Sequence, residues 1–184
     1  MLRSGLLAGF LLALSLPLAG PAVADPDDGQ VGSAAPGSND TASGWIPEDQ
    51  RLSPFDMSNA AVNRLDPDLR AAIQDATRAA QSDGITVGLT SGWRSPEYQQ
   101  QLFDDAVTRY GSAAIAAEYV ASPQVSKHVV GKAVDIGPPG ADKWLIAHGE
   151  QFGLCQIYAN EIWHFELASD YGGTCPPLRA NAAS

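Results

Sequence analysis

The chain has 184 residues and a formal net charge of -10 at pH 7, from 21 acidic and 11 basic side chains. This acidic balance argues against nucleic acid or an anionic lipid surface as the main partner, because neither would meet a basic protein surface. The length suits one domain of ordinary size with its own core.

The first 24 residues have the layout of a secretory signal peptide. Arg3 precedes an apolar run from Gly5 to Ala19, and small residues lead up to Ala24. The run is short for a membrane span. We expect cleavage after Ala24, an extracytoplasmic location and no stable membrane insertion afterwards. A retained N-terminal anchor is the alternative.

Residues 25–44 follow as a separate segment. They are mainly Gly, Ser, Ala, Pro, Asp and Asn, with almost nothing large and apolar. Such a composition buries too little surface to offset the entropy of ordering, so it predicts a disordered linker. The folded domain is expected over residues 45–184.

The first half of the domain predicts helices around one strand. Asp66-Pro67 is a helix N-cap followed by proline at the first helical position, and that helix should end at Gly84. β-Branched residues favour a buried strand over 85–90. A second helix should begin at Ser95-Pro96, and an alanine-rich third helix should span 112–121.

The second half predicts mostly short strands. Residues 132–137 alternate as a strand does, 142–152 return to helix, and 154–158 and 163–167 are further strand candidates. Helices thus come first and strands later, without a regular βαβ order. This order predicts the α+β class.

Cys155 and Cys175 are the two cysteines of the chain. Export would place them where oxidation is permitted, so we expect an intramolecular disulfide; two free thiols are the alternative. Closing a loop of about twenty residues would contribute on the order of 3 kcal/mol. The loop would enclose Glu161 and His164.

Residues with metal-binding chemistry cluster between 126 and 164. His128 precedes Asp135 by seven residues, and Glu161 precedes His164 by three. Imidazole and carboxylate groups bind zinc, three protein ligands leave one position for water, and a nearby unbound carboxylate can take that water's proton. The chain must turn between Glu161 and His164, or Glu161 must precede the strand, for both to reach one site.

Hydrogen-bonded core residues are the alternative explanation. A lone histidine on a strand is more often structural than a ligand. Asp135 is harder to explain in that way, because it lies in an apolar strand and a buried carboxylate without a partner is strongly destabilised. A metal ion would supply that partner.

The spacing resembles the paired motif of the VanY- and VanX-type D-alanyl-D-alanine peptidases. The motif is S-x-H-x-x-G-x-A-x-D over 126–135, followed by E-x-W-H over 161–164. T-S-G-W-R-S over 90–95 is similar to a further family segment. The resemblance covers roughly 58–167 and implies the zinc fold shared with the hedgehog signalling domain, in which a small antiparallel sheet packs with helices.

That resemblance implies a role for each matched residue. His128, Asp135 and His164 would bind one Zn²⁺ per chain, Glu161 would be the catalytic base, and Arg94 would stabilise the oxyanion. The substrate would be peptidoglycan stem peptides, from which VanY-type carboxypeptidases remove the terminal D-Ala. An endopeptidase, an L,D-carboxypeptidase and a non-catalytic zinc-stabilised wall-binding module are the alternatives.

Other candidates have two explanations each. Ser126 could bind substrate or cap a turn, Gln99 could reach the peptide or be solvated, and Trp163 could contact substrate or pack beneath the site. Glu166 should share a face with the second metal-ligating histidine and orient its ring. His148 lies in a predicted helix without a partner motif and is expected at the surface.

Overall fold

The computed structural model describes residues 40–184, so the expected signal segment and most of the expected linker lie outside the described residues. Within this range, four strands form one antiparallel sheet in the order β1-β2-β4-β3. The strands are β1 (Gly88–Ser91), β2 (Ala133–Gly137), β3 (Leu154–Gln156) and β4 (His164–Leu167). The predicted α+β class is confirmed.

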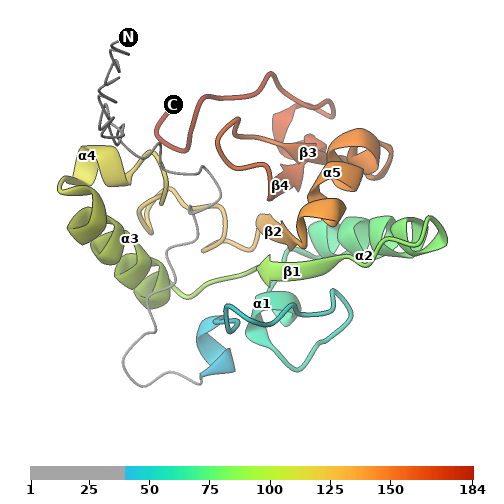
Figure 1. The fold of residues 1–184 in the computed structure, drawn as a ribbon, viewed down its shortest axis with the longest axis horizontal. Coiled ribbons are helices and arrows are strands. Elements are labelled where there is room, and N and C mark those ends of the chain that lie inside the picture. The colour runs from blue at the N-terminus through green and yellow to red at the C-terminus, as the bar shows by residue number, and fades with distance from the viewer. Residues whose placement is uncertain (1–39) are drawn as a thin grey trace, which may run out of the picture.

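Two helices and the main core cover one face of the sheet. Helix α2 (Pro67–Ser82) begins where predicted, and the Asp66 side chain accepts hydrogen bonds from the first backbone N–H groups. Helix α5 (Pro139–His148) lies beside it, to the right of the sheet in Figure 1. Apolar side chains from these helices and from the strands form one cluster, which includes Leu69, Ile73, Leu89, Val134, Ile136, Leu145, Leu154 and Phe165.

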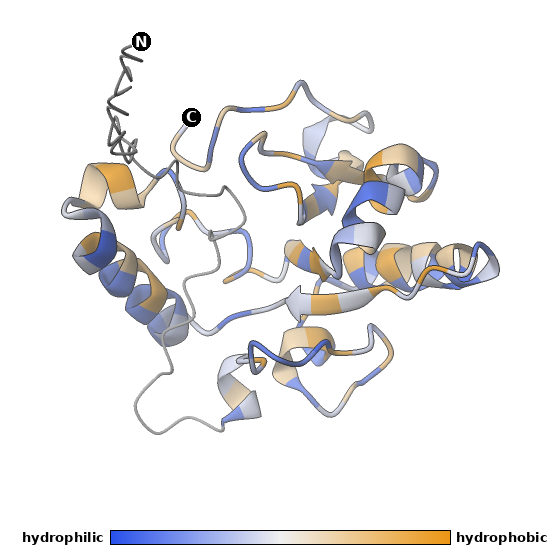
Figure 2. Cartoon of the chain, in the orientation of Figure 1, coloured by the Kyte–Doolittle hydropathy of each residue, from blue (hydrophilic) through white to orange (hydrophobic). Residues whose placement is uncertain are grey.

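Helices α3 (Pro96–Tyr110) and α4 (Ala113–Ala116) lie on the other side of the molecule, at the left of Figure 1. Figure 2 shows α4 as largely apolar. It is shorter than the predicted 112–121, because the chain turns away after Ala116 and the Tyr119 ring stacks on Tyr110, with the centroids 4.5 Å apart.

Other boundaries differ from the predictions in ways that local chemistry explains. The helix expected over 142–152 begins at Pro139, since proline is well suited to the first helical turn, and it ends at His148. A turn of 3₁₀ helix, η3 (Gly149–Phe152), continues it. The sequence did not predict the single-turn helix α1 (Ala60–Asn63).

The folded part begins earlier than the predicted boundary at residue 45. Thr41–Ser43 form a 3₁₀ turn, and the Ser95 N–H donates to the Ser43 carbonyl at 2.9 Å. Gly44 has a φ of 83° and packs so closely on Trp93 that a side chain would collide with its carbonyl oxygen. Residues 40–44, which the sequence assigned to the linker, are therefore part of the folded structure.

The C-terminal part of the chain is tied to the sheet by the predicted disulfide. Cys155 on β3 is bonded to Cys175, with the two Cα atoms 5.4 Å apart. Beyond it the chain forms a parallel bridge between Arg179 and Tyr158. No helix within residues 40–184 is long and apolar enough to cross a membrane.

Candidate active site

Two of the predicted metal ligands lie directly opposite each other on neighbouring strands. Asp135 of β2 pairs with His164 of β4. Side chains of paired residues lie on the same face of a sheet, and Asp135 Oδ1 is 3.2 Å from His164 Nδ1. Because strand side chains alternate, Val134 and Ile136 face the core while Asp135 faces the other side.

The third predicted ligand, His128, comes from the turn before β2. Its carbonyl accepts from the Gly131 N–H at 3.1 Å and from the Arg94 N–H at 3.2 Å. Gly131 has a φ of 71° and lies against the Arg64 carbonyl, which explains why the motif needs glycine here. The turn brings His128 Nε2 to 3.3 Å from Asp135 Oδ1.

These three side chains fit a zinc ion. Their ligand atoms all lie within 4.8 Å of one another, and no other such group occurs within residues 40–184. The two nitrogen–oxygen separations, 3.3 and 3.2 Å, match the roughly 3.3 Å between ligands of a tetrahedral zinc with bonds of about 2.0 Å.

The outer nitrogen of each histidine has its own acceptor. The Gly92 carbonyl oxygen is 2.8 Å from His128 Nδ1, and Glu166 Oε1 is 3.0 Å from His164 Nε2. Such acceptors hold a proton on the outer nitrogen and leave the inner one free to bind metal. The Glu166 carboxylate also accepts from the Tyr171 hydroxyl at 2.8 Å.

Negative charge is concentrated around His164. Burial opposes protonation of its ring, but hydrogen bonds to Asp135 and Glu166 outweigh that effect and raise the pKa of His164 to about 10. Burial also disfavours the charged form of Asp135, yet the neighbouring histidines and Arg94 hold the pKa of that carboxyl well below its usual value. The same carboxylates would stabilise a bound cation.

Glu161 precedes β4 and reaches the site through a turn, as the spacing required. The His164 N–H donates to the Glu161 carbonyl at 3.1 Å. The Glu161 side chain is 12% exposed, and its Oε1 has no hydrogen-bond partner among the described residues. Burial raises its pKa to about 7. A carboxyl with this pKa can take up and return a proton near neutral pH.

Arg94 is held by three hydrogen bonds. Its Nε donates to Ser91 Oγ at 2.6 Å, one terminal nitrogen donates to Gln99 Oε1 at 3.1 Å, and the other to Asp135 Oδ2 at 2.7 Å. The side chain is 15% exposed, so it is not an ordinary solvated arginine. A guanidinium has five N–H groups, and two remain for a ligand.

The predicted catalytic and metal-binding side chains line one cleft of about 440 Å³. Trp163 and Ser126 also line it, and the buried Ser126 hydroxyl has no partner among the described residues. Gln99 lies deeper than expected for a substrate contact. Its amide nitrogen donates to the Ala121 carbonyl at 2.7 Å while its oxygen accepts from Arg94, so it positions Arg94.

His148 does not line the cleft, and it is half-buried, not fully exposed at the surface as predicted. Its Nδ1 is 2.9 Å from the Trp144 carbonyl oxygen, and its ring stacks on the Trp144 ring. The sequence reasoning missed Tyr158, whose ring centroid is 5.0 Å from that of His164. It also missed the cleft residues within 45–51 and 179–182, which no motif marks.

Comparison with known proteins agrees with this geometry. A family model described as VanY, D-alanyl-D-alanine carboxypeptidase, matches residues 62–172. The chain belongs to this family. A D-alanyl-D-alanine carboxypeptidase from Enterococcus faecalis (strain ATCC 700802 / V583) is 31% identical over 145 residues, 65% of this chain and 53% of that protein. The chain thus spans about half the length of this relative.

Solved structures share the fold. One is a mutant of the vancomycin-resistance D,D-pentapeptidase VanY from the VanB-type cassette in complex with Zn(II); another is VanYB in complex with D-alanine-D-alanine. Each is 28% identical, with a TM-score of 0.56, over 71% of this chain and 90% or 89% of theirs. The LdcB LD-carboxypeptidase, at 23% identity, has the same fold, with a TM-score of 0.56 over 71% of each chain.

Proposed function

We propose that this VanY-family chain is a zinc-dependent D-alanyl-D-alanine carboxypeptidase that acts on peptidoglycan stem peptides outside the cytoplasm. The convergence of His128, Asp135 and His164 beside Glu161 and Arg94 carries the proposal. The zinc and D-alanine-D-alanine complexes of the VanY relatives support it. The signal-like segment supports export.

A zinc ion at this site would acidify a water molecule and polarise the scissile carbonyl. Glu161 accepts the proton of the attacking water and later delivers it to the amine of the departing D-alanine. The two remaining N–H groups of Arg94 stabilise the negative charge that develops on the carbonyl oxygen. The reaction thus consumes one water and yields a shortened peptide and free D-alanine.

Asp135 couples these functions. Its Oδ1 lies toward both histidines, while its Oδ2 accepts from Arg94. The carboxylate that would bind metal therefore also fixes the oxyanion-stabilising arginine. The position of the Arg94 guanidinium therefore depends on the position of the Asp135 carboxylate, and this dependence favours a catalytic site over a purely structural zinc site.

Metal and product analysis test the proposal. We expect one zinc per purified chain, loss of activity on chelation with recovery on adding zinc, and release of free D-alanine from a stem peptide ending in D-Ala-D-Ala. Release of larger fragments would instead indicate an endopeptidase. Cleavage only after an L-residue would indicate an L,D-carboxypeptidase. A fully active protein without metal would overturn the proposal altogether.

A further inference from the structure

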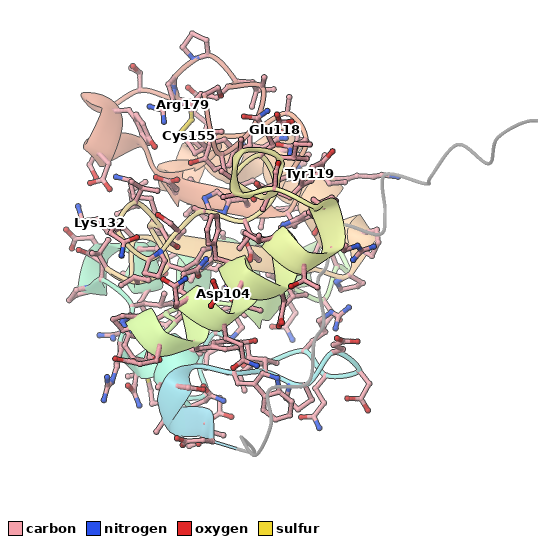
Figure 3. All side chains as sticks on the ribbon, turned by 90° about the vertical axis from the view of Figure 1, so that its left-hand side faces the viewer. Asp104, Glu118, Tyr119, Lys132, Cys155 and Arg179 are labelled. Carbon is pink, nitrogen blue, oxygen red and sulfur yellow. A yellow bond between two sulfur atoms is a disulfide. The ribbon has the colours of Figure 1, made fainter. Side chains whose placement is uncertain are left out.

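The C-terminal segment forms part of the cleft, although it lies outside the residues 62–172 that match the family. The Arg179 N–H donates to the Ile157 carbonyl at 2.9 Å, and the Arg179 carbonyl accepts from the Ala159 N–H at 2.8 Å. The Cys155–Cys175 disulfide lies four residues earlier; Figure 3 labels Cys155 and Arg179 near each other at the upper end of the molecule. The backbone of Arg179 is therefore firmly held.

One aromatic side chain connects Arg179 to the metal site. Tyr158 pairs with Arg179 along the backbone, and its ring contacts the His164 ring. Burial raises the pKa of the Tyr158 hydroxyl, and the positive charge of the nearby Arg179 guanidinium opposes that shift. The guanidinium also lies 5.9 Å from the centroid of the Tyr171 ring. Arg179 thus lies about one side chain away from the proposed reaction centre.

Positive charge is unusually concentrated in this cleft for so acidic a chain. Four of the 11 basic side chains line it: Arg51, Arg94, Lys127 and Arg179. They outnumber the three acidic side chains of the cleft, Glu48, Asp135 and Glu161. A local excess of one sign of charge attracts ligands of the other sign, so these basic side chains favour an anionic group on the substrate.

Two of these four side chains already have partners within the protein. Arg94 is paired with Asp135, and Arg51 donates to the carbonyls of residues 48 and 50. Within residues 40–184, Arg179 and Lys127 have no carboxylate at ion-pair distance. A guanidinium presents paired N–H donors that match a carboxylate, and its rigid fork makes it more selective than an ammonium.

We propose that Arg179 binds a carboxylate of the peptide substrate, so that the disulfide-anchored C-terminal segment is part of the substrate site. The proposal rests on the peptidase function inferred above. Two carboxylates have the required chemistry: the terminal one of the departing residue and a side-chain one on the acyl side of the scissile bond. Peptides in which one or the other is an amide distinguish them.

The side chain can be tested without disturbing the backbone. The structural hydrogen bonds of Arg179 to residues 157 and 159 use only its main chain, so Arg179→Met keeps them along with most of the side-chain length. Arg109→Met is a matched control, because Arg109 also lies over a tyrosine ring, 5.7 Å from the Tyr110 centroid, but does not line the cleft. Arg179→Lys keeps the positive charge but loses the paired N–H donors of the guanidinium.

Dissociation constants are measured by calorimetry in a Glu161→Gln background, where turnover should be slow enough for peptide binding to be measured. We expect Arg179→Met to weaken binding of the fully acidic peptide roughly tenfold or more, as for a lost charged hydrogen bond. Arg179→Lys should recover part of this loss, and Arg109→Met should cause none. When the recognised carboxylate is amidated, the peptide should bind with the same affinity whether or not the chain carries the Arg179→Met substitution.

A purely structural role would weaken all peptides equally, and that result would overturn the proposal. The proposal would also be overturned if Lys127→Met abolished the preference for the acidic over the amidated peptide while Arg179→Met left that preference intact. Cleavage by the wild-type enzyme, followed separately, tests the peptidase function. A failure of that function is therefore distinguishable from a failure of carboxylate recognition.

Discussion

The two sides of the cleft are built in different ways. The proposed metal-binding side rests on the paired strands β2 and β4, where the register sets Asp135 opposite His164, and further hydrogen bonds orient the rings of His128 and His164. The terminal sides, residues 45–51 and 179–182, lie outside the four strands and pair with the rest of the chain through isolated bridges, Leu52 to Leu89 and Arg179 to Tyr158. The family match covers only the first side.

This difference suggests that the strand side of the cleft carries out catalysis and that the terminal sides recognise the substrate. Catalysis requires groups placed to within about half an ångström, which a sheet with supporting hydrogen bonds provides. Substrate recognition can be added on segments that lie outside the sheet. Changes on the strand side should therefore alter turnover and zinc binding, whereas changes on the terminal sides should alter substrate affinity.

The largest effect should come from Glu161→Gln, which keeps the size of the side chain and removes the proton acceptor. Turnover should fall by roughly 10²- to 10⁴-fold. Zinc content and thermal stability should be unchanged, because Glu161 is not one of the three proposed ligands. Steady-state kinetics with metal analysis measure this. Turnover close to that of the wild type would exclude Glu161 as the base.

Removing the disulfide tests the terminal side. Cys155→Ala/Cys175→Ala opens a loop with a sequence separation of 20, which should lower the free energy of unfolding by about 3 kcal/mol. In the folded enzyme KM should rise while turnover and zinc content stay close to wild type. Urea denaturation and kinetics measure both effects. Loss of zinc together with the rise in KM would show that the two sides are not independent.

The smallest effect should come from the residues that support the zinc ligands. Glu166→Gln keeps the volume of a fully buried side chain but weakens the acceptor for His164. Zinc affinity should fall roughly 10- to 100-fold, as for other such partners. Tyr171→Phe, which removes only the hydrogen bond to that carboxylate, should have a weaker effect in the same direction. Competition with a chelator measures the zinc affinity of both variants. A changed KM with unchanged zinc affinity would contradict the assignment of zinc binding to the strand side and substrate affinity to the terminal sides.

The sequence by itself determined the features that are encoded locally. Asp66-Pro67 predicted the start of α2 because capping depends on neighbouring residues. Alternation along β2 placed Asp135 on one face of a strand, and its seven-residue spacing from His128 marked both as candidate metal ligands, which the structure brings together. Helix and strand lengths were less predictable, as the early end of α4 shows, because tertiary contacts decide where an element stops.

Only the tertiary structure decided which distant residues meet. Gln99 supports Arg94, and Tyr171 supports Glu166, because strand register and the path of the chain bring them together. The disulfide could be predicted, but its consequence for Arg179 could not, since no pattern in the sequence shows that residues 179–182 return to the cleft. Chemistry that depends on sequence spacing is readable from the chain, whereas chemistry that depends on packing appears only when the chain has folded.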